Sequence, residues 1–376
     1  MPTPLPPEFE LLILLSRQDL DDAALHRTRE LITGAAGAVD WPHFTDQATQ
    51  HKVGPLVHRS LVKVQQAGRL AELDITAFSL LQWAYLYFTE RSVLLAAELG
   101  RILAAAAAAS VPLLLRKGSH LAYQVYRDPG VRPMGDLDLL AEPEAAGRLS
   151  AVLRDLGYTE GNSEEDRGLT RREQIFWRMY GSDLPQLTLR TGSSYCPVYC
   201  ADISVALTLP RTTTPIPLGP LLERSVGVQV GGQPARVMSP ADTVFDLCLH
   251  LYKNSTVLRF MRRGKHRRLL KYVDIAECLR TAGDGFDWAQ LTGLARQYDV
   301  AGPVLFSLTG VDRLFPGVVP PAVLDELRAD YPRWEPLLDE YGQWELPEPR
   351  RLSGSFPHRF FDRATDAELP ASKSMV

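Results

Sequence analysis

At 376 residues the chain exceeds the usual span of one hydrophobic core, so two or three packed units are expected. Its 45% hydrophobic and 23% charged residues are typical of a globular protein, and its formal net charge of −4 gives no general attraction to nucleic acid or anionic lipid. Four cysteines are too few for a disulfide scaffold, which favours a reducing, cytoplasmic location.

No stretch of the sequence predicts a membrane span. The N-terminal apolar run, residues 11–15, is too short for a signal peptide and has charges close by. The longer apolar stretch, residues 93–115, is interrupted by Glu98, Arg101 and Pro112, which favours a packed helix. We therefore expect no membrane partner.

Residues 1–90 predict an N-terminal helical unit, because their apolar residues recur at helical spacing. Asp40 offers an N-cap within this unit. Residues 91–109, which include six consecutive alanines, predict a further helix that Ser110 and Pro112 end.

Residues 91–238 predict a core in which a mixed sheet carries helices. Helices are expected at 120–126 and 143–156. Strands are expected at 111–115, 136–140, 174–180, 186–191, 198–207 and 226–237, the last with a turn at Gly231 and Gly232.

Residues 239–345 predict a C-terminal helical unit that begins at Ser239, and residues 346–376, rich in proline, serine and charge, predict a poorly ordered tail. The predicted fold class is α+β: a mixed β-sheet core with helices, flanked by N-terminal and C-terminal helical units.

Two aspartates stand one residue apart in the otherwise apolar strand at 136–140. On a strand, residues i and i+2 point the same way, so Asp136 and Asp138 share a face with their Cα atoms roughly 6.5–7 Å apart. Two such carboxylates repel unless a cation lies between them, and magnesium, with manganese as an alternative, prefers oxygen ligands. Asp202, in the later strand, is the candidate third carboxylate of a catalytic metal site.

A Lys-Gly-Ser turn precedes a predicted helix. Its backbone N–H groups and the helix dipole suit the phosphates of a nucleotide, so Gly118 and Ser119 are predicted to bind nucleotide. Lys117 and Arg132 are predicted to neutralise phosphate charge.

The one concentrated positive patch is the run from Arg259 to Lys271, preceded by His250 and Lys253. We predict that His250, Lys253 or groups of this run contact the triphosphate or an acidic acceptor; a solvated helix face is the alternative. The absence of a recognisable nucleic-acid module argues against nucleic acid as a partner.

These motifs also have interpretations other than a catalytic site. An Asp-x-Asp pair is also typical of a solvated strand edge, and Cys196 with Cys200 could suggest zinc, although no second ligand pair stands at finger-like spacing. The order of the motifs is more informative than any one of them.

That order resembles the nucleotidyltransferase superfamily of DNA polymerase β. More closely, the segments "LRKGSHLAYQVYRDPGVRPMGDLDLL" and "LRDLGY" resemble a bacterial family of uncharacterised nucleotidyltransferases, and "DWPHFTDQATQHKVGPLVHRSL" and "SPADTVFDLCLHLYKN" resemble its flanking helices. The likeness covers most of residues 8–330. One departure is Asp202-Ile203-Ser204, where relatives often have an acid-Leu-His sequence.

The resemblance implies that Asp136 and Asp138 bind catalytic metal, that Gly118 and Ser119 hold nucleotide phosphate, and that Asp202 is the third acid. It implies transfer of a nucleoside monophosphate from an NTP to a hydroxyl or phosphate acceptor, with release of pyrophosphate. It allows a small metabolite, a peptide natural product, a protein or an RNA as the acceptor, and the flanking helical units favour a confined small-molecule or peptide substrate, such as one of a natural-product tailoring pathway. A phosphoryl- or glycosyl-type transferase on the same fold and a non-catalytic nucleotide-binding module remain alternatives.

Overall fold

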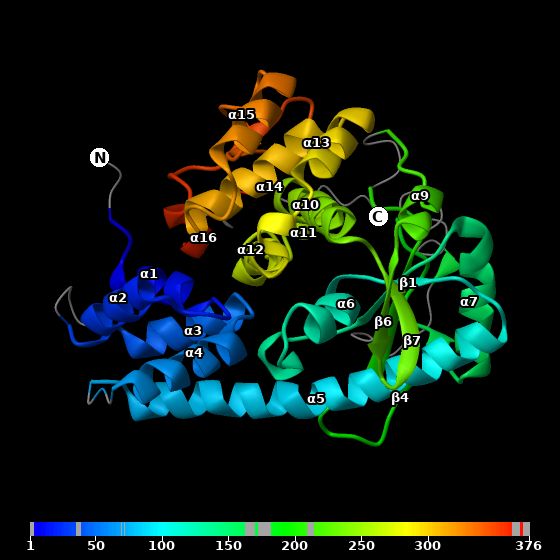
Figure 1. Cartoon of the computed structure of the whole chain (residues 1–376), viewed down its shortest axis with the longest axis horizontal. Helices are drawn as coiled ribbons and strands as arrows, with labels where there is room; N and C mark the ends of the chain where they lie inside the picture. Colours follow the sequence, from blue (N-terminus) through cyan, green and yellow to red (C-terminus); the bar gives the residue numbers. More distant parts are fainter. Residues whose placement is uncertain are drawn as a thin grey trace.

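The computed structural model describes residues 4–34, 39–68, 70, 72–161, 170–171, 182–208, 214–362 and 369–370. A seven-stranded mixed sheet lies to one side of two groups of helices, one formed by the N-terminal and one by the C-terminal part of the chain (Figure 1). The predicted α+β class is confirmed.

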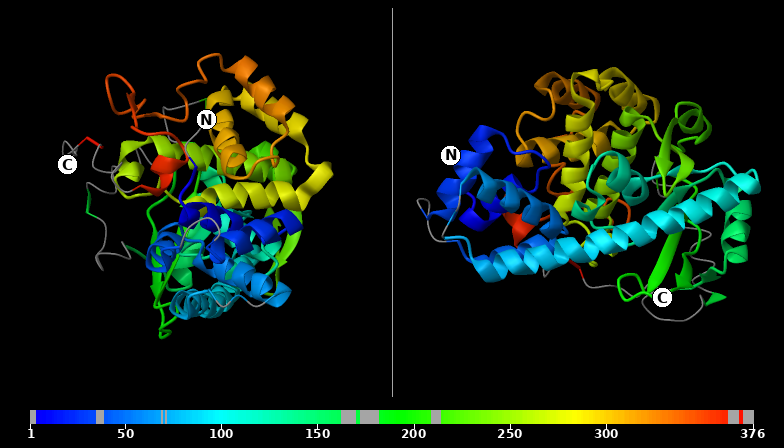
Figure 2. Two further views of the ribbon diagram at one scale, coloured as in Figure 1. Left: turned by 90° about the vertical axis from the view of Figure 1, so that its left-hand side faces the viewer. Right: turned by 60° about the horizontal axis from the view of Figure 1, so that its bottom comes forward.

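The N-terminal part is helical, as predicted, and Asp40 caps α3 by accepting a hydrogen bond from the backbone N–H of His43. Its longest helix, α5, runs without interruption beneath the molecule from the N-terminal helices to the sheet (Figure 2). The division predicted at residue 90 stays a prediction, and α5 crosses it. The helices are α1 (Pro7–Leu15), α2 (Asp22–Ile32), α3 (Trp41–Gln50), α4 (Gly54–Ala67) and α5 (Ile75–Ala108).

The sheet has the strand order β3-β4-β5-β2-β1-β7-β6. β2 pairs parallel with β5 and antiparallel with β1, so β2 lies at the centre. The predicted strand at 174–180 lies outside the described residues, and of the strand predicted at 111–115 only Leu114 and Leu115 pair with neighbours. The strands are β1 (Leu114–Leu115), β2 (Leu137–Leu140), β3 (Thr159–Glu160), β4 (Leu187–Arg190), β5 (Val198–Ser204), β6 (Val226–Val230) and β7 (Gln233–Val237).

The two faces of the sheet belong to two different cores. Leu137 and Leu139 of β2 pack with α5 and with α7 (Pro143–Asp155). Leu140, on the other face, joins the core made by the N-terminal and C-terminal helices, next to α6 (Lys117–Gln124). Because side chains alternate along a strand, Asp138 faces α6 and the C-terminal helices rather than α5.

The hairpin of β6 and β7 touches α5 backbone to backbone. A Cβ added at Gly100 would lie 2.3 Å from the carbonyl oxygen of Gly231, and Gly231 itself has φ +57°. Only glycine fits both positions, so this pair fixes where the sheet sits along α5.

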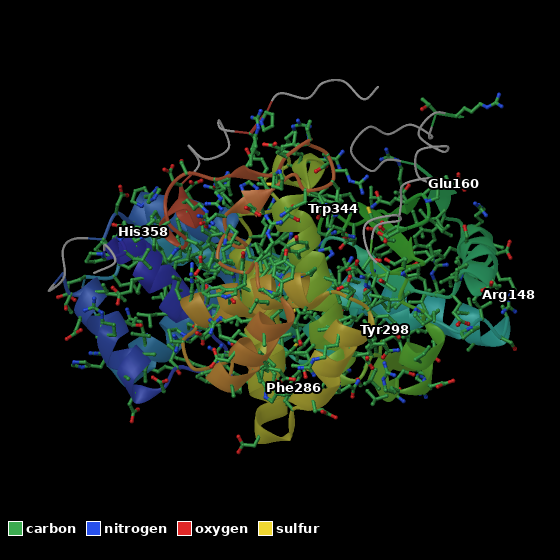
Figure 3. The ribbon with its side chains drawn as sticks, turned by 90° about the horizontal axis from the view of Figure 1, so that it is seen from above. Arg148, Glu160, Phe286, Tyr298, Trp344 and His358 are labelled. Carbon is green, nitrogen blue, oxygen red and sulfur yellow. The ribbon has the colours of Figure 1, made fainter. Side chains whose placement is uncertain are left out.

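The C-terminal helices begin at α10, where Ser239 accepts a hydrogen bond from the N–H of Asp242 as the predicted N-cap. Figure 3 shows Phe286, Tyr298 and Trp344 among these helices. The elements are η1 (Pro129–Val131), α9 (Gly219–Glu223), α10 (Pro240–Thr256), α11 (Leu258–Met261), α12 (Leu269–Ala282), η2 (Gly283–Gly285), α13 (Trp288–Gln297), α14 (Ala301–Leu314) and α15 (Pro321–Asp330).

Part of the segment predicted as a tail is packed. β9 (Arg350–Arg351) pairs with β8 (Glu340–Tyr341), and α16 (His358–Phe361) buries Phe360 and Phe361 in the core. Both rings lie about 5 Å from the ring of His51, so this segment joins the two helical groups.

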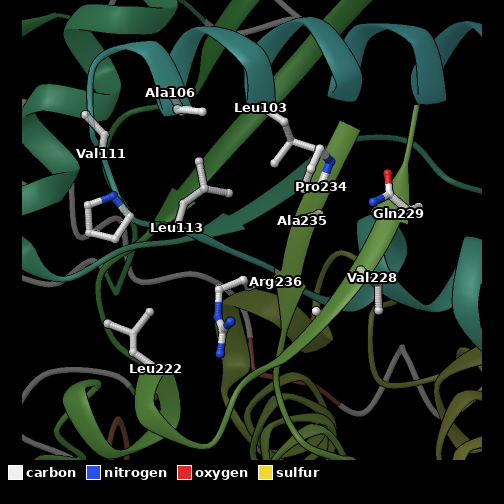
Figure 4. A pocket seen from close by; sticks show the side chains of 13 residues that line it. Leu103, Ala106, Val111, Leu113, Leu222, Val228, Gln229, Pro234, Ala235 and Arg236 are labelled. Carbon is white, nitrogen blue, oxygen red and sulfur yellow. The ribbon is translucent and has the colours of Figure 1, made fainter. Parts of the chain in front are cut away.

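An apolar cavity of about 580 Å³ lies between the end of α5, the β6–β7 hairpin and α9 (Figure 4). Leu103, Leu113 and Val228 line it, and Arg236 lies at its edge. Residues 111–113 enter the sheet at this end of β1, whereas Lys117 follows the other end, so the cavity is separate from the aspartates described next.

Candidate active site

Two neighbouring parallel strands bring the three predicted acids together. Asp138 in β2 and Asp202 in β5 are register partners, and Asp136 stands two residues before Asp138. One carboxylate oxygen from each of Asp136, Asp138 and Asp202 lies within 4.8 Å of the others. We call these three residues the acid cluster. The predicted convergence of Asp202 with the Asp-x-Asp pair is therefore present in the fold.

The three carboxylates of the acid cluster repel one another. Burial, Asp136 and Asp138 together raise the pKa of Asp202 to about 7, although Gln186 donates a hydrogen bond to its Oδ1 at 2.9 Å. Burial also raises the pKa of Asp138, and Lys117 opposes that shift. Three carboxylate oxygens at this spacing offer the ligands that a hard divalent cation prefers, and such a cation would relieve their repulsion.

The residues predicted as a Lys-Gly-Ser turn form the start of α6 and lie directly against the acid cluster. Lys117 begins α6, and its Nζ donates a hydrogen bond to Asp138 Oδ1 at 2.6 Å. The buried Ser119 Oγ accepts a hydrogen bond from the Asp138 backbone N–H at 2.8 Å. A Cβ added at Gly118 would lie 2.9 Å from Arg132 and Met134, so the chain packs too tightly here for a larger residue. Lys117 and Ser119 therefore fix the position of Asp138.

Arg132 has a different neighbour from the one predicted. Its Nε and Nη2 donate hydrogen bonds to both carboxylate oxygens of Asp274 in α12, at 3.0 and 2.7 Å, and the Tyr126 hydroxyl donates to the same carboxylate. All three residues are buried. This pair joins the sheet region to the C-terminal helices, and a phosphate contact of Arg132 stays a prediction.

His250 and Lys253 lie one turn apart on α10. Burial and the charges of Lys117, Lys271 and Lys253 hold the pKa of His250 well below its usual value, and His250 Nδ1 has no hydrogen-bond partner among the described residues. Lys253 Nζ donates to the Ser182 hydroxyl at 3.4 Å, and burial lowers the pKa of Lys253 to about 8. Their nucleotide contacts stay predictions.

A buried polar network beside the acid cluster was missed from the sequence. Arg116 donates to both carboxylate oxygens of Asp246 in α10 and, at 2.6 Å, to the hydroxyl of Ser204 at the end of β5. Ser204 in turn donates to Asp183. Lys253, Lys117 and Arg116 outweigh the effect of burial and lower the pKa of Asp183 to about 2. The sequence offered one sign of this network, because Asp246 stands four residues before His250, about one helical turn away.

A second missed residue is Arg91 of α5. Its guanidinium donates hydrogen bonds to the carbonyl oxygens of Met134 and Gly135, at 2.9 and 3.0 Å, and to that of Tyr195 at 3.1 Å. Gly135 directly precedes Asp136, so Arg91 holds the backbone from which Asp136 projects.

Within the described part of the chain, the acid cluster is the one group of three close metal-ligating side chains, and Cys196 and Cys200 belong to none. No described helix combines the length and apolar character of a membrane span.

Comparison with known proteins gives a match to one family model. A family model described as uncharacterised nucleotidyltransferase matches residues 37–316, most of the chain. The chain belongs to this nucleotidyltransferase family. No curated protein and no solved structure matches it. In this nucleotidyltransferase the matched region contains the acid cluster, the Lys-Gly-Ser turn and the buried network around Arg116.

We expect the Asp202→Asn variant to be more heat-stable than the unsubstituted nucleotidyltransferase at pH 8 in EDTA. The folded protein holds the Asp202 proton up to about pH 7, and the unfolded chain releases it near 3.8, so ionisation of Asp202 destabilises the fold as the pH rises through this window. The expected gain is on the order of 2 kcal/mol, or roughly 4 °C in Tm.

Thermal unfolding at pH 5 and pH 8 measures this effect. The gain should shrink at pH 5, where the folded protein already carries the proton, and the control Asp284→Asn, at an exposed acid, should change neither Tm. A variant less stable than the unsubstituted protein at pH 8 would contradict the prediction.

Proposed function

We propose that this nucleotidyltransferase moves a nucleoside monophosphate from an NTP to an acceptor hydroxyl or phosphate, with magnesium or manganese held by Asp136, Asp138 and Asp202. The observation that carries this proposal is the convergence of the three carboxylates within 4.8 Å. The same convergence favours catalysis over a binding module without turnover, which needs no third acid.

In the proposed reaction an acceptor oxygen attacks the α-phosphorus of the NTP. The new O–P bond forms as the bond to the β-phosphate oxygen breaks, pyrophosphate leaves with that electron pair, and the acceptor proton passes to a base. Asp202, the third carboxylate of the acid cluster, is placed to accept this proton. A divalent cation in the acid cluster would supply Lewis-acid stabilisation of the phosphoryl oxygens.

Residues around the acid cluster are assigned to binding of the triphosphate. Lys117 and Lys253 are placed to neutralise the triphosphate, and Gly118 and Ser119 present backbone N–H groups at the start of α6. His250 and Arg132 stand close behind them and belong to the same proposal.

The proposed acceptor is a small molecule or a peptide rather than a duplex, because α6 and the C-terminal helices lie over the sheet face that carries the acids. The proposed location is the cytoplasm, since all four cysteines are free and buried.

Product analysis tests the proposed reaction. The protein is incubated with each NTP and magnesium, with water as the default acceptor, and the products are separated by mass. We expect NMP and pyrophosphate, formed only when magnesium is present. Formation of NDP instead would favour a phosphoryl transferase, and failure of every magnesium–NTP analogue to bind by calorimetry would refute the proposal.

A further inference from the structure

Three lysines gather near the acid cluster, where the N-terminal helices meet the C-terminal helices. The junction is made by His51, whose carbonyl oxygen accepts from the N–H of Leu270 at 3.2 Å and whose Nδ1 accepts from the N–H of Leu269 at 3.1 Å. Lys52 follows His51, and Lys271 follows Leu270, so two lysines project from the two sides of one contact.

The third member comes from the loop before α12. Lys271 Nζ donates a hydrogen bond to the carbonyl oxygen of Lys265 at 2.8 Å, which brings the two residues together. Lys52 and Lys265 are exposed, and Lys271 lies deeper. We call Lys52, Lys265 and Lys271 the lysine cluster. It includes the end of the basic run noted in the sequence and adds a residue from a distant part of the chain.

The three lysines lie close together although their positive charges repel one another. Burial and then the charges of Lys265, Arg268, Lys117 and Lys52 lower the pKa of Lys271, and each of these four neighbours is a cation. No carboxylate among the described residues forms an ion pair with any of the three lysines. An anion bound among the three lysines would offset their mutual repulsion and favour the charged form of Lys271.

The lysine cluster lies beside the acid cluster. The charge of Asp136 acts on both Lys52 and Lys265, that of Asp202 acts on Lys265, and that of Lys117 acts on Lys271. Lys253, by contrast, has Asp183 as its strongest charged neighbour. In an in-line displacement at phosphorus, the attacking oxygen and the leaving pyrophosphate lie on opposite sides of the α-phosphorus. In the proposed reaction Lys253 contacts the triphosphate, so the acceptor would enter from the side of the lysine cluster.

We propose that Lys52, Lys265 and Lys271 bind an oxyanion carried by the acceptor, so that the acceptor of this enzyme is a molecule with a phosphate or carboxylate group near the hydroxyl that is modified. This assignment rests on the proposed nucleotidyl transfer and names the class of its second substrate. Lysine ammonium groups bind both oxyanions as charge-assisted donors.

Calorimetric titration of the full-length protein tests the assignment. The protein is first saturated with magnesium and a non-hydrolysable NTP analogue, and inorganic phosphate or acetate is then titrated as the probe. We expect phosphate, acetate or both to bind while the analogue is bound, and the tighter probe to identify the oxyanion. Lys52→Gln and Lys271→Gln should each weaken that binding by about tenfold and change the affinity for the analogue by less than about threefold.

Two further variants complete the design. Lys253→Gln should show the reverse pattern, and Lys63→Gln, a surface lysine of α4 paired with Asp19, should change neither affinity. Lys52 is exposed, so the Lys52→Gln protein is expected to fold even if the Lys271 variant does not.

Three results would overturn the assignment: phosphate that competes with the analogue, a loss of analogue affinity in the Lys52 and Lys271 variants, or probe binding that these variants leave unchanged. Failure of the analogue to bind the unsubstituted protein would instead refute nucleotidyl transfer. Titration of the same probes without the analogue would then show separately whether the lysine cluster binds an anion.

Discussion

The Asp138→Asn variant is expected to lose metal-dependent turnover, with a fall of roughly 10⁴-fold in the rate of pyrophosphate release. Asp138 is 4% exposed and lies at the centre of the site, between the other two acids and Lys117. Asparagine keeps the shape of the side chain and the backbone contact to Ser119 but removes the charge that a divalent cation needs.

Two measurements check this expectation. Pyrophosphate release is followed with NTP, magnesium and water as the acceptor, and manganese affinity is measured directly by electron paramagnetic resonance. The exposed-acid variant Asp284→Asn serves as the matched control and should keep both. An Asp138→Asn protein that is folded by circular dichroism and still binds manganese as tightly as the unsubstituted protein would refute the role of Asp138 as a metal ligand.

The largest loss of stability is expected from Arg116→Met. Arg116 and Asp246 are each about 1% exposed, and the substitution leaves a buried carboxylate without its cation and Ser204 without its donor. Removing one partner of such a pair costs about 3–5 kcal/mol. Because Asp246 belongs to α10, the same pair also fixes the helix that carries His250 and Lys253.

Urea denaturation measures the change in the free energy of unfolding. The double variant Arg116→Met with Asp246→Leu should recover much of the loss, since no buried charge is then left alone. The matched control is Arg351→Met, at an exposed pair with Glu340, which should cost less than about 1 kcal/mol. A single Arg116→Met variant as stable as that control would contradict the assignment of a buried, mutually dependent pair.

The local chemistry of the site could be predicted from the sequence. Strand alternation predicts Asp136 and Asp138 on one face, because neighbouring residues of a strand point to opposite sides. In the fold Asp136 directly precedes β2, one residue short of the predicted strand, and its carboxylate still lies near that of Asp138. The N-caps Asp40 and Ser239 and the turn at Gly231 were likewise readable, since each depends on a few adjacent residues. The third acid, Asp202, was a candidate because it stands within another strand-like run, and the resemblance to a known family implies the same role.

The tertiary structure alone decided which distant groups meet. The register between β2 and β5 sets Asp202 beside Asp138, and packing of α12 gives Arg132 the partner Asp274 in place of a free guanidinium. Arg116 and Asp246 are 130 residues apart in the sequence. The His51 junction that assembles the lysine cluster joins positions still farther apart.

The physical reason for this division is the range of the interactions involved. Caps, turns and strand alternation follow from backbone geometry over a few residues, so the sequence by itself predicted the strand that carries Asp138 and the change from strand to helix around Gly118. Pairing of buried charges and the register of strands depend on how whole elements pack, because burial makes an unpaired charge costly only once a core has formed. Packing therefore decided the partners of Arg132 and Arg116 and the meeting of Lys52 with Lys271.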